Sequence, residues 1–455
     1  TLTGTNTYTG GTTVSAGGLT GNTTSVQGAI VNNAEVEFAQ ASAGTYAGAM
    51  SGTGGLTKTG AGTLTLTGTN TYTGTTNLNA GTIKVGNDSA LGTGALAMAT
   101  GTTLETSAAT QTLANAVAIT GTGTVDTNTG NTLTLGGVVS GGALTKIDTG
   151  TLSLTGANTY TGGTTLSGGT IQVGNSAALG TGALAMATGT TLESSAANLT
   201  VANTVAITGT STVDTNANTL TLGGVVSGSG TLTKTDTGTL SLTGANTYTG
   251  GTNLTGGTIR VVTNSALGTG ALTMATGTTL ESDANLTVAN TVAITGTGTV
   301  DTNGNALTLS GVVSGGTLAK TDTGTLVLSG ANTYTGGTTL SGGTIQVGSN
   351  TALGTGALAM ASGTTLDAGT ADRTLANAVA ITGTSTVDTN TGKTLTLGGV
   401  VSGSGTLTKI DSGTLLLSGA NTYTGGTTLS GGTIQVGTNT ALGTGALAMA
   451  ADTTL

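Results

Sequence analysis

The sequence has 455 residues, of which 84 are glycine and none is proline, cysteine, histidine or tryptophan. Its formal net charge is -9, and 6% of its residues are charged. Without cysteine or histidine the chain has no thiolate zinc site and lacks the commonest metal ligand and general base. Its 9 basic residues argue against nucleic acid as a partner, and no apolar run is long enough for a membrane-spanning helix.

The chain is a repeat. The pentapeptide NTYTG begins at Asn6 and returns with spacings of 64, 88, 88, 86 and 89 residues. Self-similarity at a fixed period is typical of solenoids and arrays, so we expect one continuous solenoid segment of a longer protein. The approximate units are 1–69, 70–157, 158–245, 246–331, 332–420 and 421–455.

Within these units the predicted elements are short strands. In chain order they include TLTL at 63–66, TIKV at 82–85, TVDT at 124–127, TLSL at 151–154 and TIQV at 170–173. Each alternates β-branched or aliphatic residues with polar ones at a period of two, which is the pattern of half-buried strands. No segment shows the 3.6-residue period of a helix, so the sequence predicts an all-β protein.

Each 88-residue unit is divided again. The polar residues that follow aliphatic ones, Glu105, Asp126, Asp148, Gln172 and Glu193, lie 21, 22, 24 and 21 residues apart. The steps predict about 22 residues per coil and four coils per unit, with parallel strands about 4.8 Å apart. The result is a parallel β-helix whose inward side chains stack from coil to coil. Those we expect inside include Leu152, Leu154, Ile171, Val173, Leu184 and Met186.

A long motif carries a family resemblance. GTLTLTGTNTYTGTTNLNAGTIKVG, from Gly62 to Gly86, follows GTGGLTKTGAG and resembles the passenger-associated repeat of bacterial autotransporters. The pattern includes a recurring lysine at Lys58, Lys146, Lys234, Lys320 and Lys409. The resemblance implies a right-handed β-helix secreted across an outer membrane and displayed at the bacterial cell surface. In such proteins a signal peptide and a C-terminal outer-membrane barrel carry the passenger out; neither is recognisable in these 455 residues, which fits a segment of a longer protein.

Few groups are candidates for chemistry. The Lys-x-Asp pairs, such as Lys146 and Asp148, suggest an acid/base pair or, as we prefer, exposed ion pairs worth about 0–1 kcal/mol. Glu193, Asp214 and Asp236 are expected on successive coils, where their carboxylates are the one candidate cation site and suit Ca²⁺. The alternative for these carboxylates is solvated charge at the edge of the coil. We predict no catalytic residue, no metal and no cofactor.

Three other residue patterns have structural interpretations. The repeated tyrosines are expected to cover corners, with an apolar ring and a hydrated hydroxyl. The methionines of GALAMA are expected to fill the core. Threonine-rich stretches such as TNTYTG resemble ice-binding solenoids, but β-propensity alone explains most of the threonine.

These observations predict length rather than a pocket, and hence a protein that is not an enzyme. The first functional prediction is an adhesive or structural rod, the passenger or stalk of an autotransporter-like surface protein. The alternative is a self-assembling extracellular fibre in which the β-helix is the filament, and an ice- or cation-binding solenoid is more remote. Expected partners are other copies, neighbouring repeats of the full-length chain, and host or cell-surface ligands; no nucleic acid and no membrane contact are expected of this segment.

Overall fold

A computed structural model describes all 455 residues as β-strands joined by turns. The chain divides into two compact units, Thr1–Gly230 and Thr231–Leu455. Each unit is a parallel β-solenoid, which confirms the predicted fold class at that level. The structure has no helix with the length and apolarity needed to cross a membrane. Whether one solenoid runs uninterrupted through both units, divided as the sequence repeat predicts, stays a prediction.

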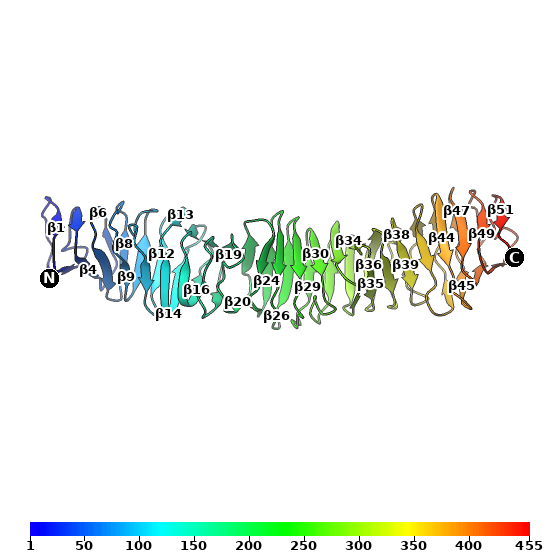
Figure 1. The fold of residues 1–455 in the computed structure, drawn as a ribbon, viewed down its shortest axis with the longest axis horizontal. Helices are drawn as coiled ribbons and strands as arrows, with labels where there is room; N and C mark the ends of the chain where they lie inside the picture. The colour runs from blue at the N-terminus through cyan, green and yellow to red at the C-terminus, as the bar shows by residue number, and fades with distance from the viewer. The chain divides into compact units, whose positions relative to one another are not determined.

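The first unit stacks its strands in chain order, and they lie side by side from blue to green in Figure 1. One ladder contains β2 (Gly18–Gly21), β4 (Glu35–Ala39), β7 (Gly55–Thr59), β9 (Thr76–Leu78), β11 (Leu96–Met98), β14 (Val117–Asp126), β16 (Val139–Ile147), β18 (Thr164–Leu166), β20 (Leu184–Met186), β23 (Val205–Ile207) and β26 (Val226–Ser227). A second contains β5 (Gly44–Tyr46), β8 (Thr63–Leu66), β10 (Thr82–Val85) and β12 (Thr103–Thr106), and joins β14. The others are β13 (Thr110–Leu113), β15 (Thr132–Leu135), β17 (Thr151–Leu154), β19 (Thr170–Val173), β21 (Thr191–Ser194) and β24 (Thr210–Asp214); β22 (Leu199–Val201) with β25 (Thr219–Leu222); and β1 (Thr12–Val14), β3 (Ile30–Asn32) and β6 (Met50–Ser51).

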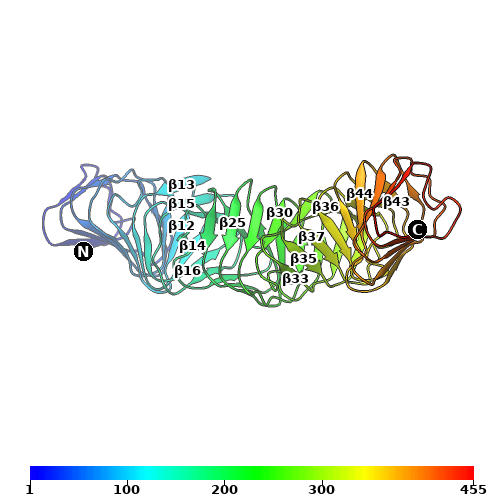
Figure 2. The same ribbon diagram turned by 45° about the vertical axis from the view of Figure 1, so that its right-hand side comes forward.

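The second unit repeats this arrangement, and Figure 2 shows several of its strands from another side. One ladder contains β27 (Thr231–Thr235), β29 (Thr252–Leu254), β31 (Leu272–Met274), β34 (Val292–Asp301), β36 (Val313–Thr321), β38 (Thr338–Leu340), β40 (Leu358–Met360), β43 (Val379–Ile381) and β46 (Val401–Ser402). A second contains β28 (Thr239–Leu242), β30 (Thr258–Val261) and β32 (Thr278–Ser282). The others are β33 (Leu286–Val288), β35 (Ala306–Leu309), β37 (Thr325–Leu328), β39 (Thr344–Val347), β41 (Thr365–Asp367), β44 (Thr384–Asp388), β47 (Thr406–Ile410), β49 (Thr427–Leu429) and β51 (Leu447–Met449); and β42 (Arg373–Leu375), β45 (Thr394–Leu397), β48 (Thr414–Leu417) and β50 (Thr433–Val436).

Every ladder stacks like residues in register. Leu64 pairs with Ile83, Ile83 with Leu104, and Leu104 with Val125, and all four side chains are buried. Because side chains alternate across a strand, their polar neighbours face outward. Ile171 is fully buried and Gln172 is partly exposed, which confirms the predicted direction of both side chains. The stacked aliphatics are therefore a continuous core within each unit.

The coil length differs from the predicted 22 residues. From Lys58 the ladder steps to Leu78, Met98, Ile119 and Gly141, which are 20, 20, 21 and 22 residues apart. Four coils thus end at Gly141, five residues before Lys146, the repeat of Lys58. A repeat is therefore slightly longer than four coils.

The sequence steps misled because they joined residues of different ladders. Asp126 pairs with Ile147, so Asp148 lies just beyond the ladder, in a turn. Gln172 pairs with Ser153 on one side and Glu193 on the other, and neither Asp148 nor its strand belongs to that ladder. The 24-residue step therefore crosses between ladders, and the average coil is shorter than the sequence suggested.

The repeated NTYTG segment is internal scaffold. Asn158 accepts a hydrogen bond from the Val139 amide at 2.7 Å and donates from Nδ2 to the Ala178 carbonyl at 2.6 Å, so one amide bridges the coils on either side. Tyr160 is fully buried, and its hydroxyl hydrogen-bonds the hydroxyl of Thr164 at 2.6 Å. The prediction of a hydrated corner tyrosine is wrong, because the threonine four residues later gives the hydroxyl a buried partner.

The same tyrosine–threonine pair recurs. The other pairs are Tyr72 with Thr76, Tyr248 with Thr252, Tyr334 with Thr338 and Tyr423 with Thr427. Burial raises the pKa of Tyr160 to about 12, so these hydroxyls remain protonated at physiological pH. The predicted core role of the methionines is confirmed for Met98, Met186, Met274 and Met360, which are buried, whereas Met449 is 45% exposed.

Candidate functional site

The five repeated lysines are the most unusual charged groups of the protein. Lys58, Lys146, Lys234, Lys320 and Lys409 all have fully buried side chains. The Nζ atom of Lys146 donates to the carbonyl oxygens of Ile147, Asp148 and Gly168, at 2.8, 2.8 and 3.2 Å. Three carbonyls thus surround the ammonium, an arrangement that we call the lysine cage.

The cage is built in the same way in the other repeats. Lys58 donates to Thr59, Gly60 and Ala80, and Lys409 to Ile410, Asp411 and Gly431. In each cage two carbonyls come from the residues directly after the lysine and the third from the next coil. The corresponding acceptors are Thr235, Asp236 and Gly256 for Lys234, and Thr321, Asp322 and Gly342 for Lys320.

A left-handed residue completes the turn of each cage. Asp148 has φ of 63°, and Gly60 holds the same place in the first cage with φ of 77°. Glycine, asparagine and aspartate are the residues that adopt this region most readily. The Asp148 side chain is exposed, and its Oδ1 accepts the Thr149 amide at 2.7 Å. The Asp148 carbonyl, rather than its carboxylate, therefore contacts the lysine.

The predicted exposed Lys-x-Asp ion pair is consequently wrong. The two side chains do not share a strand face, because the aspartate lies in the turn after β16 while the lysine points into the core. Burial lowers the pKa of Lys58, Lys146 and Lys320 to about 8, since the ammonium has lost its water. All the same, the amine is enclosed by backbone and has no route to a substrate, so its role in the cage is structural.

The outward acidic residues form hydrogen-bonded ladders. In the first unit Ser153 donates to Gln172 at 2.9 Å, and Gln172 donates to Glu193 at 2.9 Å. Asn216 donates to the same Glu193 oxygen at 3.1 Å. The ladder thus crosses four coils through side chains alone, and the glutamate is held between two amides.

The same ladder position carries an ion pair in other repeats. Lys84 pairs with Glu105 at 2.6 Å, and Arg260 pairs with Glu281 at 3.0 Å. In the repeat after Arg260 the position is Gln346, which donates to Asp367 at 2.7 Å. Because lysine, arginine and glutamine all occupy it, the ladder needs a hydrogen-bond donor there rather than a particular charge.

The candidate cation ligands are only partly brought together. Glu193 and Asp214 are register neighbours on β21 and β24, as predicted, whereas Asp236 belongs to the second unit. Its counterpart within the first unit, Asp148, lies in a turn off the ladder, so the predicted column of three carboxylates does not form there. The structure contains no group of three or more acidic side chains arranged to hold a metal ion. Among these acids, burial raises the pKa of Asp388, the partner of Asp367.

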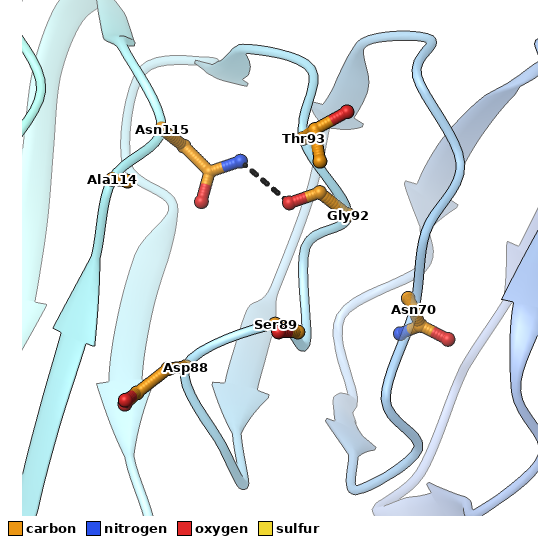
Figure 3. Close-up of a pocket in the computed structure, with 7 residues that line it drawn as sticks. All are labelled: Asn70, Asp88, Ser89, Gly92, Thr93, Ala114 and Asn115. Atoms are coloured by element: carbon orange, nitrogen blue, oxygen red, sulfur yellow. Dashed lines mark hydrogen bonds between the residues drawn. The ribbon is translucent and has the colours of Figure 1, made fainter.

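A shallow hollow recurs on the surface of the first unit, and Figure 3 shows one copy. It has a volume of about 220 Å³ and lies beside the turn that contains Asp88, Ser89 and Gly92, with Ala114 and Asn115 on the next coil. The equivalent place in the following repeat is a hollow of about 270 Å³, lined by residues that include Ser176, Gly180, Ala202 and Asn203. Sequence reasoning missed this place. The available signal was the recurring tetrapeptide Ala-Asn-(Ala/Thr)-Val, beginning at Ala114, Ala202, Ala289 and Ala376.

The comparisons with known proteins agree with the resemblance noted in the sequence. Six segments match the model of a family described as Passenger-associated-transport-repeat. They are residues 1–20, 56–85, 144–173, 232–261, 318–347 and 407–436. The five longer segments each contain one lysine cage and part of the following NTYTG segment. Neither the curated proteins nor the solved structures give a match to the chain.

Proposed function

We propose that this chain, which carries six passenger-associated transport repeats, is a rod-like passenger segment of an autotransporter-like protein, exposed outside the cell. The single observation that carries the proposal is the six-fold match to a passenger repeat along a parallel β-solenoid. A solenoid grows by adding coils that contact only their neighbours, so its length is not limited by the size of one core. Such a fold suits a stalk that holds a binding surface away from the membrane.

The proposal includes a right-handed coil. Parallel strands joined by crossover connections are right-handed in about 98% of cases, and the family resemblance implies the same hand. It also includes one continuous solenoid through the whole chain, because the repeat keeps its period of 86–89 residues on both sides of residue 230.

A non-catalytic role follows from how the polar groups are used. The cage lysines donate to backbone carbonyls, the NTYTG asparagines bridge coils, and the ladder glutamates are held by amides or cations. An active site needs unlike groups that converge on one reacting atom. Here each polar group is instead repeated in equivalent positions, which favours scaffold and multivalent binding over catalysis.

Surface labelling tests the proposal. Antibodies raised against the purified chain should label intact cells of the source organism, and external protease should remove the labelled epitope without lysis. Labelling that requires permeabilised cells would refute the extracellular role. Electron microscopy of the native material then separates two forms: single rods projecting from the cell would support the stalk, and bundled filaments would support the fibre alternative.

A further inference from the structure

One buried amide in each long repeat has an unused acceptor. The residues are Asn115, Asn203, Asn290 and Asn377, which are 5, 7, 7 and 6% exposed. Asn115 donates from Nδ2 to the carbonyls of Gly92 and Gly94, at 3.2 and 2.6 Å. Asn203 does the same toward Gly180 and Gly182, at 3.1 and 2.6 Å. The Nδ2 group is therefore committed to the scaffold, whereas Oδ1 accepts no hydrogen bond in any of the four.

The free oxygen faces the recurring hollow. In Figure 3 the Asn115 oxygen is turned away from Gly92 toward the space above Asp88 and Ser89, while its nitrogen makes the bond to the glycine. Polar atoms of buried side chains normally have a hydrogen-bond partner. Because the same oxygen is unpaired in four repeats, a ligand that donates a hydrogen bond there would supply the missing partner.

The opposite wall of the hollow also presents oxygen. The position is Asp88 in the first copy and Ser176, Asn264 and Asn350 in the next three. Each accepts the amide of a strand residue on the following coil, at 2.8 to 3.0 Å. An acidic side chain occurs in only one copy, so negative charge is not what the copies share. They share oxygen acceptors, and no basic side chain lines the hollows at Asn115 and Asn203.

We propose that these hollows bind hydroxyl groups of a neutral saccharide, one sugar residue in each hollow, with asparagine Oδ1 accepting from a sugar hydroxyl. Hydroxyls suit acceptors that are mostly uncharged, whereas an ammonium ligand would need a carboxylate in every copy. The volumes of about 220 and 270 Å³ are below the roughly 300–1,000 Å³ of sites for drug-sized molecules and suit a single ring. The inference rests on the extracellular role proposed above and gives it a partner class.

A single hollow would bind weakly, because it is shallow and offers few contacts. A dissociation constant of about 1 mM is the appropriate scale. Repetition along one chain would raise the avidity for a polymeric or surface-bound glycan by a factor of about 10²–10⁴ where several hollows engage together. Repeated weak sites are therefore useful for adhesion to a surface that displays many sugars.

Saturation-transfer NMR on the full chain tests the proposal. The probes are methyl glycosides of glucose, galactose, mannose and N-acetylglucosamine, followed by a glycan array that contains both mammalian-type glycans and bacterial polysaccharides. We expect at least one neutral glycoside to bind. The blocking variant replaces the exposed alanine at the rim of each hollow, as Ala114→Gln, Ala202→Gln, Ala289→Gln and Ala376→Gln. Its affinity should fall at least ten-fold.

A matched variant places the same side chain two residues further along. It carries Ala116→Gln, Thr204→Gln, Thr291→Gln and Ala378→Gln, all at exposed positions beside the same asparagines but absent from the lining of the hollows. It should bind like the unmodified chain. The proposal is overturned if no glycoside binds the unmodified chain, or if the two variants lose affinity equally. Surface labelling does not depend on this result, so failure of saccharide binding would leave the extracellular rod standing.

Discussion

Replacing one caged lysine by methionine tests the cage most directly. In Lys146→Met the thioether cannot donate, so the carbonyls of Ile147, Asp148 and Gly168 lose the ammonium donor inside the core. Removing one partner from a buried charged set typically costs about 3–5 kcal/mol. Relief from burying the ammonium offsets part of this cost, so we expect the coils around β16 and β18 to open about 3 kcal/mol more easily. That corresponds to roughly a 100-fold faster exchange of their amides.

Hydrogen exchange followed by mass spectrometry measures this opening coil by coil. The matched control is Lys84→Met, the same substitution in the same unit at a lysine whose side chain is 29% exposed and pairs with Glu105. A surface ion pair is worth about 0.2–1 kcal/mol, so its coils should exchange no more than about five-fold faster. If both variants exchanged alike, or if Lys146→Met slowed exchange, the cage would not be a stabilising element and the argument from three carbonyl partners would be refuted.

Further predictions concern the core, the tyrosine and pH. Ile171→Asp places a carboxylate in the aliphatic stack and should lower the free energy of unfolding by several kcal/mol, whereas Gln172→Lys, next to it but outward, recreates the Lys84–Glu105 type of pair and should change it by under about 1 kcal/mol; equal denaturation midpoints would contradict the assigned directions. Tyr160→Phe should cost about 1–1.5 kcal/mol in chemical denaturation, and adding Thr164→Val should recover most of it; no recovery would mean that the hydroxyl pair is not what stabilises. The cage lysines have a folded pKa of about 8 against an ordinary 10.5, so the unfolded chain binds more protons between these values and the free energy of unfolding should rise with pH from about 8 to 10; a fall over that window would show that the folded pKa is not depressed.

The lysine cages have a consequence for how the repeat specifies its own register. Coils of similar sequence can in principle pair with the wrong neighbour, and a slip of one residue turns every side chain to the other face. A buried lysine that finds three carbonyls only in the correct register makes such a slip costly. In Lys146 the third carbonyl, Gly168, belongs to the next coil, so the cage ties adjacent coils as well as closing its own turn.

The sequence by itself determined the repeat, the β class and the direction of the core residues. These depend on local alternation, and Ile171 and Gln172 show that a period of two assigns inside and outside correctly wherever a strand is regular. The family resemblance also rests on contiguous letters, which need no structure to be compared.

Tertiary structure alone decided what the polar residues do. Lys146 lies at an inward position of its strand, but charge led us to place it outside, since only the folded turn shows the carbonyls of Asp148 and of Gly168 on the next coil. Coil length was likewise hidden, because turns of different length let residues with the same sequence spacing join different ladders. The unused oxygen of Asn115 could not be foreseen either, since it depends on which side of the amide the glycine carbonyls of the preceding coil occupy. In each case the partner is about 20 residues away and is brought near only when the coil closes.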